Sequence, residues 1–133
     1  MSSFTDPLIV KKLKDSLWET ASEFEYHVGV EGSENKIKVP VGFTTDFASI
    51  PRLFWIIYPP DGQYTQAAVL HDYLYNIQDR HRATADAIFL EAMQVLGVPF
   101  LRRKIIYRAV RLFGWIPWNN RARKKKKQQG GKR

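Results

Sequence analysis

The sequence has no cysteine and no apolar run that approaches the length of a membrane span. Without cysteine there is no disulfide framework and no thiolate metal site. A transmembrane helix needs about 20 consecutive apolar residues, so the chain has no such helix. The first residues lack the basic-then-apolar order of a signal peptide, and we expect synthesis in the cytoplasm. At 133 residues with 44% hydrophobic content, the chain fits one globular domain.

Acidic residues are absent from the last third of the chain. All 13 acidic residues lie at or before Glu91, whereas 13 of the 21 basic residues follow it. The part up to Glu91 therefore carries a formal charge of −5 and the rest carries +13, which gives the net charge of +8. A segment this basic favours anionic partners.

The N-terminal half predicts a small antiparallel β-sheet. Residues 16–30 and 35–43 show partial period-two alternation, which places Phe24 and Tyr26 on one face. The glycine and serine residues between the two segments predict a turn near Gly32.

The second half predicts helices over 63–78, 83–96 and 99–113, from the spacing of apolar residues and the breakers between them. The last 15 residues, NNRARKKKKQQGGKR, are of low complexity, and we expect them to be disordered. The predicted class is α+β: a small N-terminal antiparallel sheet, a three-helix half and a disordered basic tail. The domain is expected over 1–118 and the tail over 119–133.

A histidine and an aspartate are adjacent inside the first predicted helix, in the stretch AAVLHDYLYN. His71 shares its helical stripe with Tyr75, on the side that the helix should bury. In the next helix, Asp86 precedes Phe89 by three residues on the apolar stripe, so its carboxylate should also face the core. A buried carboxylate needs a partner.

The two helices are joined by a short turn near Arg80, so they should be antiparallel, with His71 and Asp86 at a similar height. We predict that a carboxylate oxygen of Asp86 lies about 2.6–3.2 Å from a ring nitrogen of His71. A buried aspartate orients an imidazole as a general base in many enzymes, but such a pair is also found as a structural network. Asp72 would project beside it, suited to a hard cation or a water.

The motifs HDYLY and RATADAIFLEAM resemble the His-Asp helix pair of secreted phospholipase A2, over residues 67–96. In that family the histidine activates water, the adjacent aspartate holds Ca²⁺, and the later aspartate and the tyrosine orient the histidine. The resemblance therefore implies a catalytic set of His71, Asp86 and Tyr75. It also implies a divalent cation as cofactor, Ca²⁺ in first place, held by Asp72.

The motifs VPVGFTTDFASIPR, AAVLHDYLY and ADAIFLEAM together look like a family of phages and prophages that is described only as a domain of unknown function, over roughly residues 20–115. This resemblance implies a phage or prophage origin, synthesis in the host cytoplasm and a possible place in the virion, but no activity. It adds Asp46, within TTDFASIP, as a second candidate metal ligand. An aspartate in such a loop is equally suited to capping a turn or a helix start.

The basic C-terminal third is amphipathic. The stripe expected to face the core is Leu101, Ile105, Ala109 and Leu112. The stripe expected to face solvent is Lys104, Arg108 and Arg111. Trp115 and Trp118 before the lysine run suit a lipid headgroup region, while the same cations suit nonspecific binding of nucleic-acid phosphates. Deleting 121–133 is expected to leave stability almost unchanged but to weaken binding to DNA or anionic vesicles.

Two functions fit these patterns. The first is a metal-assisted hydrolase of an ester or phosphodiester, with His71 as base, Asp86 orienting it and Asp72 holding a metal or water. The second is a non-enzymatic phage virion or accessory protein, with a structural His-Asp network and a basic tail that binds DNA, membrane or another phage protein. An open cleft over His71 would favour the enzyme, and a fully covered His71 would favour the second function.

Overall fold

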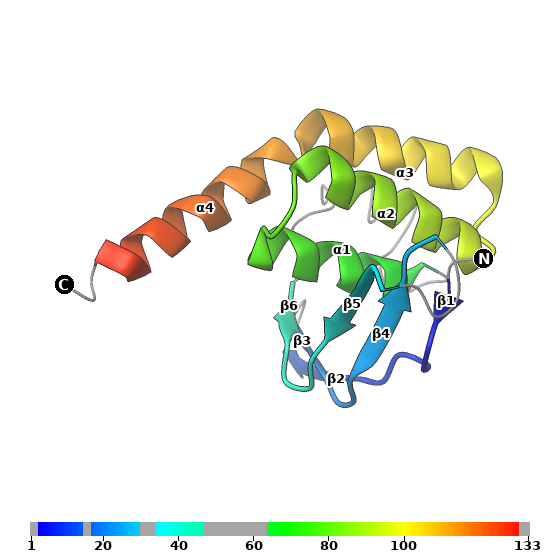
Figure 1. Cartoon of the computed structure of the whole chain (residues 1–133), viewed down its shortest axis with the longest axis horizontal. Helices are drawn as coiled ribbons and strands as arrows, with labels where there is room; N and C mark the ends of the chain where they lie inside the picture. The colour runs from blue at the N-terminus through cyan, green and yellow to red at the C-terminus, as the bar shows by residue number, and fades with distance from the viewer. Residues whose placement is uncertain (1–2, 15–16, 30–33, 47–63, 131–133) are drawn as a thin grey trace.

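The computed structural model describes residues 3–14, 17–29, 34–46 and 64–130. The elements in these ranges are, in chain order, β1 (Ser3–Phe4), β2 (Val10–Lys14), β3 (Leu17–Thr20), β4 (Phe24–His27), β5 (Lys36–Val39), β6 (Thr44–Thr45), α1 (Thr65–Ile77), α2 (Arg82–Val95), α3 (Phe100–Phe113) and α4 (Trp115–Gly130). Strands come first and helices follow, which confirms the predicted α+β class (Figure 1).

The strands form two small antiparallel sheets, with the orders β1-β4-β5 and β2-β3-β6. The predicted hairpin is present as β4 and β5, in which Phe24 pairs with Val39 and Tyr26 pairs with Ile37. These four side chains alternate with more exposed ones along their strands and join the hydrophobic core. The turn predicted near Gly32 lies outside the described residues.

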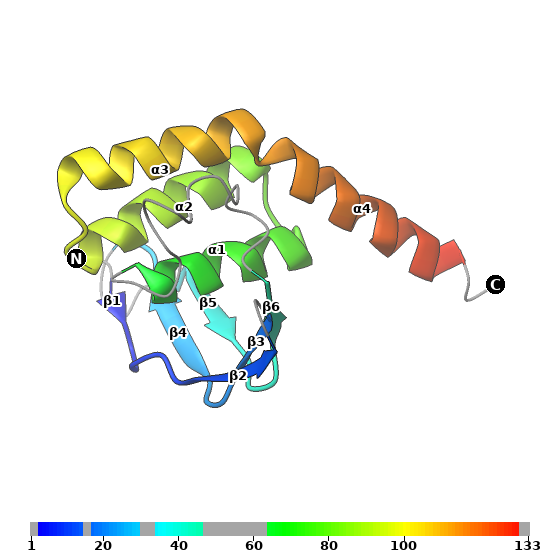
Figure 2. The ribbon, with the colours of Figure 1, turned by 180° about the vertical axis from the view of Figure 1, so that it is seen from behind.

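The first three helices form successive layers over the strands. In Figures 1 and 2, α1 lies between the strands and α2, and α2 lies between α1 and α3. Helix α4 leaves this body and extends to the C-terminal end of the chain. Among the described residues, no helix is both long and apolar enough to pass through a bilayer.

The first three helices match the predicted segments closely, and their ends follow local rules. Helix α1 stops at Gln78, which has a left-handed backbone with a φ of 50°. Helix α2 stops before Gly97, whose φ of 79° is a conformation that glycine adopts without strain. Pro99 then precedes α3, because its fixed φ suits a helix start.

Residues 119–130 differ from the expected disorder, because they continue α4 as a helix. Lysine, arginine, alanine and glutamine all have good helix propensity, so the composition permits this conformation. Hydrogen bonds also attach α4 to the end of α1: Gln78 Nε2, just after α1, donates to the carbonyl of Trp118 at 2.8 Å, and Lys125 Nζ of α4 donates to the carbonyl of Ile77. Low complexity indicated disorder here, but anchoring to a neighbouring helix stabilises a helix instead.

The core face of α3 shares only Ala109 with the predicted stripe. Leu101 and Leu112 are 71% and 66% exposed. The buried residues of α3 are Ile106, Ala109 and Val110, on a stripe rotated by about one residue. Both stripes are apolar, so periodicity alone left the choice between them open, and the packing against α2 decides it.

Candidate functional site

The site begins with the pair that the sequence predicted. His71 projects from α1 and Asp86 from α2, and His71 Nε2 lies 2.7 Å from Asp86 Oδ1. Both side chains are 0% exposed. The imidazole stacks on Phe89, with ring centroids 4.4 Å apart and an angle of 25° between the planes. The predicted hydrogen bond and the predicted burial of both residues are therefore confirmed.

Three further donors complete the surroundings of Asp86. The hydroxyl of Tyr75 donates to the same Oδ1 at 2.6 Å. The other oxygen, Oδ2, accepts from Arg111 Nη1 at 2.8 Å and from Arg82 Nη1 at 3.3 Å. Each carboxylate oxygen thus has two donors, which is what a fully buried charge requires.

The protonation states in this cluster follow from its contacts. Burial alone would raise the pKa of Asp86, but the hydrogen bonds from His71, Tyr75 and Arg111 outweigh it and hold that pKa below its usual value. Burial, together with the hydrogen bond to the Asp86 carboxylate, raises the pKa of Tyr75. Asp86 is therefore ionised at neutral pH, while Tyr75 keeps its proton and donates it.

These states assign the proton on His71. An ionised carboxylate only accepts hydrogen bonds, so the Nε2 atom facing Asp86 must carry a proton. In the neutral ring, Nδ1 is then the acceptor and the only nitrogen suited to act as a base. The arrangement thus orients an imidazole in one tautomer and holds it rigidly.

The arginines of the cluster were missed in the sequence. Arg111 was placed on the solvated stripe of α3, but its side chain is 34% exposed and turns back to Asp86. Arg82 lies four residues before Asp86 in α2, which is the one spacing that pointed to an ion pair. Arg82 also donates to the carbonyl of Val110 at 3.1 Å, so it links α2 to α3.

Gly114 was missed as well, and it allows the helices to approach the cluster closely. A Cβ atom at this position would overlap the Val110 carbonyl oxygen, and it would lie 2.5 Å from the Tyr75 hydroxyl oxygen and 3.2 Å from Arg82 Nη1. Gly114 is therefore required by space, and its φ of −65° shows that conformation is not the reason. A glycine directly after the predicted helix 99–113 was the only signal in the sequence.

Asp72 has a separate set of partners. Its Oδ2 accepts from Thr45 Oγ1 at 2.6 Å and its Oδ1 accepts from Arg121 Nη2 at 2.5 Å. Asp72 is 1% exposed, so these bonds satisfy a buried charge. Asp46 is 51% exposed and lies 3.9 Å from the same Arg121 nitrogen. The two candidate metal ligands are thus brought together around a guanidinium.

The partners of Asp72 and Asp46 affect whether these two residues can bind a metal ion. In the parts of the chain that the structure describes, no three His, Asp or Glu side chains are grouped closely enough to hold one. Arg121 occupies the side of Asp72 that faces Asp46. A divalent cation at Asp72 would have to displace this guanidinium, because like charges repel at such distances. The residues as arranged therefore fit Arg121 better than they fit Ca²⁺.

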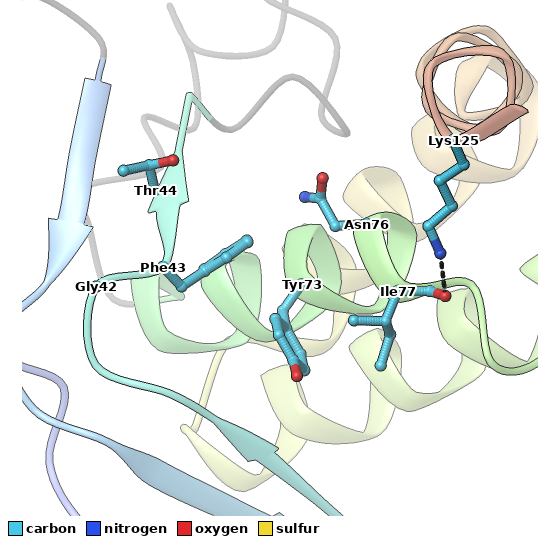
Figure 3. A pocket seen from close by; sticks show the side chains of 7 residues that line it. All are labelled: Gly42, Phe43, Thr44, Tyr73, Asn76, Ile77 and Lys125. Atoms are coloured by element: carbon cyan, nitrogen blue, oxygen red, sulfur yellow. Dashed lines mark hydrogen bonds between the residues drawn. The ribbon is translucent and has the colours of Figure 1, made fainter. Parts of the chain in front are cut away.

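A hollow of about 620 Å³ lies on the far side of α1 from His71. Phe43 and Tyr73 border it, and Lys125 approaches from α4 to the carbonyl of Ile77 at its edge (Figure 3). Tyr73 is two residues from both His71 and Tyr75, so it projects from the opposite face of the helix. The hollow therefore offers no route to the buried imidazole.

The family profile described as "Protein of unknown function (DUF1353)" matches residues 18–110. A relative in Sinorhizobium fredii (strain NBRC 101917 / NGR234), "Uncharacterized protein y4jT", is 35% identical over 100 residues, which are 74% of this chain and 29% of that protein. The chain thus spans less than a third of the length of this relative. No solved structure matches the chain. Because this family match covers more than half of the chain, the chain belongs to the DUF1353 family.

Proposed function

We propose that the chain is a non-enzymatic accessory protein that binds an anionic surface through its C-terminal helices. In this proposal the His71–Asp86 network is a structural clamp that fixes α3 to the domain, and the Asp72–Arg121 pair fixes α4. The observation that carries it is the complete burial of His71 and Asp86 at 0% exposure, with each carboxylate oxygen of Asp86 accepting two hydrogen bonds. A covered histidine suits a clamp better than a base that must meet a substrate.

The clamp positions the basic helices through arginine. Arg111 ties α3 to Asp86, and Arg121 ties α4 to Asp72. The remaining cations of α4 that the structure describes as exposed are Arg123, Lys124 and Lys126. Because no acidic residue follows Glu91, nothing in this part of the sequence neutralises them. A fixed row of cations favours a polyanionic partner.

The phage or prophage origin remains part of this proposal. It is supported by the motifs TTDFASIP and HDYLY, and it places synthesis in the host cytoplasm. In a phage, the basic helices would anchor the chain to a virion protein or to another phage protein.

The test compares two triple variants that remove equal charge. Arg123→Gln, Lys124→Gln and Lys126→Gln together should weaken binding to both a short DNA duplex and phosphatidylglycerol vesicles by about tenfold or more, and should lower the salt slope on DNA by about 2–3. The control changes the exposed lysines Lys11, Lys36 and Lys38 to Gln and should leave both affinities nearly unchanged. Equal effects of the two triples would refute a C-terminal binding site.

A hydrolase is the second candidate, because one observation favours it. His71, Asp86 and Tyr75 are connected through a single carboxylate oxygen, in the roles that the phospholipase A2 resemblance implies. His71 would act as base through Nδ1, with Asp86 and Tyr75 orienting it. Calcium at Asp72, with Asp46 beside it, would require Arg121 to move away. Millimolar Ca²⁺ should then raise the melting temperature, and Asp72→Asn should abolish that rise.

Two substitutions of His71 separate the candidates. Gln at position 71 keeps a nitrogen donor for Asp86 but is not a base, whereas Leu removes the donor. A clamp predicts that His71→Gln retains most of the stability and that His71→Leu loses about 1–3 kcal/mol. A hydrolase predicts that fatty-acid release from phosphatidylglycerol vesicles, with calcium present, is lost in both variants. Hydrolysis by the unaltered chain that disappears in His71→Gln would overturn the clamp as the main role.

A further inference from the structure

Exposed apolar side chains gather where α3 meets α4. Leu112, Phe113, Trp115 and Ile116 are 66%, 48%, 53% and 46% exposed, within five residues of chain around Gly114. We call these four residues the elbow. Large apolar side chains scattered singly over a surface are ordinary, but four exposed ones within five residues of chain indicate an interaction site.

The elbow continues onto the exposed face of both helices. Leu101 and Arg108 lie eleven and four residues before Leu112, so they share its stripe on α3. On α4, Arg123 follows Ile116 by seven residues and Lys126 follows Trp115 by eleven, spacings that again fall on one face. Both cations are exposed, as is Arg108. The outer surface is thus apolar at the elbow and basic on either side of it.

Among the described residues, the outward cations of this face form no ion pair with an acidic side chain. Arg111 and Arg121 point inward and use the two buried carboxylates. The outward cations come from a segment that contains no acidic residue. The fold therefore assigns some arginines to hold the helices and leaves the others to a partner.

We propose that the elbow and its flanking cations lie on the surface of an anionic lipid bilayer. This inference rests on the proposed binding of an anionic surface, and it names that surface. The helices would lie in the plane of the membrane–water interface. The elbow would be at the boundary between headgroups and acyl chains, and Arg108, Arg123 and Lys126 would contact the headgroup phosphates. A tryptophan at the boundary between apolar and charged surroundings suits this depth.

The side chains favour lipid over nucleic acid. Phosphate binding needs cations, and contacts to phosphates alone do not bury exposed leucine and isoleucine. A bilayer buries the apolar residues and neutralises the cations at once. A second copy of the chain would leave a different signature, and it is an outcome of the test.

The test uses the full chain and three variants. The elbow variant is Leu112→Ser with Ile116→Ser, both at exposed positions. Its matched control is Ile9→Ser with Val41→Ser, which are 52% and 60% exposed on the strand side of the domain. The charge variant is the triple Arg123→Gln, Lys124→Gln, Lys126→Gln. Each is measured by co-sedimentation with vesicles of phosphatidylcholine alone or with phosphatidylglycerol, by binding to a short DNA duplex, and by sedimentation velocity.

The elbow variant should bind phosphatidylglycerol vesicles about tenfold or more weakly, with DNA binding unchanged within about twofold. The charge variant should weaken both, and the control neither. If the elbow variant binds vesicles as the unaltered chain does, the bilayer inference is wrong, while charge-dependent DNA binding would keep the proposed function. If the unaltered chain binds neither vesicles nor DNA, the proposed function fails too. An elbow variant that only separates a dimer makes the elbow a contact between copies and also overturns the inference.

Discussion

Asp86 and Asp72 are both buried, but the fold satisfies them in different ways. Asp86 receives four hydrogen bonds from three helices, including two from arginines. Asp72 accepts a hydrogen bond from Thr45 on one oxygen and from Arg121 on the other. In the described part of the chain, its only cationic partner comes from α4. A charge with many donors tolerates the loss of one, whereas a charge with a single cation depends on it. Asp86 therefore unites the helical core, and Asp72 couples that core to α4.

The largest effect should follow from removing the acceptor that Asp86 provides. Asp86→Ala leaves Arg111, Arg82 and the Tyr75 hydroxyl without their shared partner, and should lower the free energy of unfolding by about 3–5 kcal/mol. Asp86→Asn keeps one acceptor oxygen and should cost less. Urea unfolding followed by circular dichroism measures both. A loss below about 1 kcal/mol for the alanine variant would show that the cluster is not the clamp of the helical core.

Arg121 provides the matching test for Asp72. Arg121→Met keeps most of the apolar stem but removes the cation, and should cost about 2–3 kcal/mol because a buried carboxylate loses its charged donor. Arg123→Met, two residues further along the same helix and exposed, is the control and should change little. Deletion of 121–133 should cost as much as Arg121→Met, contrary to the expectation from the sequence alone. A truncated chain with unaltered stability would mean that α4 is not coupled to the core.

Gly114 tests how closely the helices approach the cluster. Gly114→Ala places a methyl group against the Val110 carbonyl and the Tyr75 hydroxyl, and should cost about 1–3 kcal/mol through overpacking. The same change made in a Tyr75→Phe background should cost less, because the hydroxyl that it meets is gone. Equal costs in the two backgrounds would show that the overlap with Tyr75 is not the reason for the glycine.

The pH dependence of stability separates the contribution of Asp86 from that of Tyr75. Asp86 has a lowered pKa, so its contribution is present above its ordinary value of 3.8 and is lost as the pH falls through its value in the folded state. Tyr75 has a raised pKa, so its contribution is present below 10.0 and is lost as the pH rises further. Tyr75→Phe should lose about 1 kcal/mol at neutral pH. Melting temperatures of the variant should fall less steeply above about pH 10 than those of the unaltered chain.

The sequence predicted those parts of the site that lie on helical stripes. His71 and Asp86 could be placed because each shares a face with apolar neighbours and the turn between their helices is short. Arg111, Arg121 and Thr45 could not be placed, since their roles depend on how distant segments approach α1 and α2. Of the exposed elbow, the sequence indicated Trp115, but the apolar character of both stripes of α3 hid the exposure of Leu112. Tertiary packing, which local pattern does not encode, decides these features.

Substitution of Asp79, an exposed carboxylate, should have the smallest effect on stability. Asp79 contrasts with the two buried carboxylates, Asp86 and Asp72. Like Asp86, it has a lowered pKa, here because Arg80 donates to it at 3.0 and 3.1 Å. Its side chain is 49% exposed, so water screens the pair. Asp79 also follows the C-terminal end of α1, where a negative charge opposes the helix dipole and offsets part of the gain. Asp79→Asn should therefore change the free energy of unfolding by less than about 0.5 kcal/mol, and added salt should reduce even that difference. A loss comparable to that of Asp86→Asn would show that burial does not set the difference between these carboxylates.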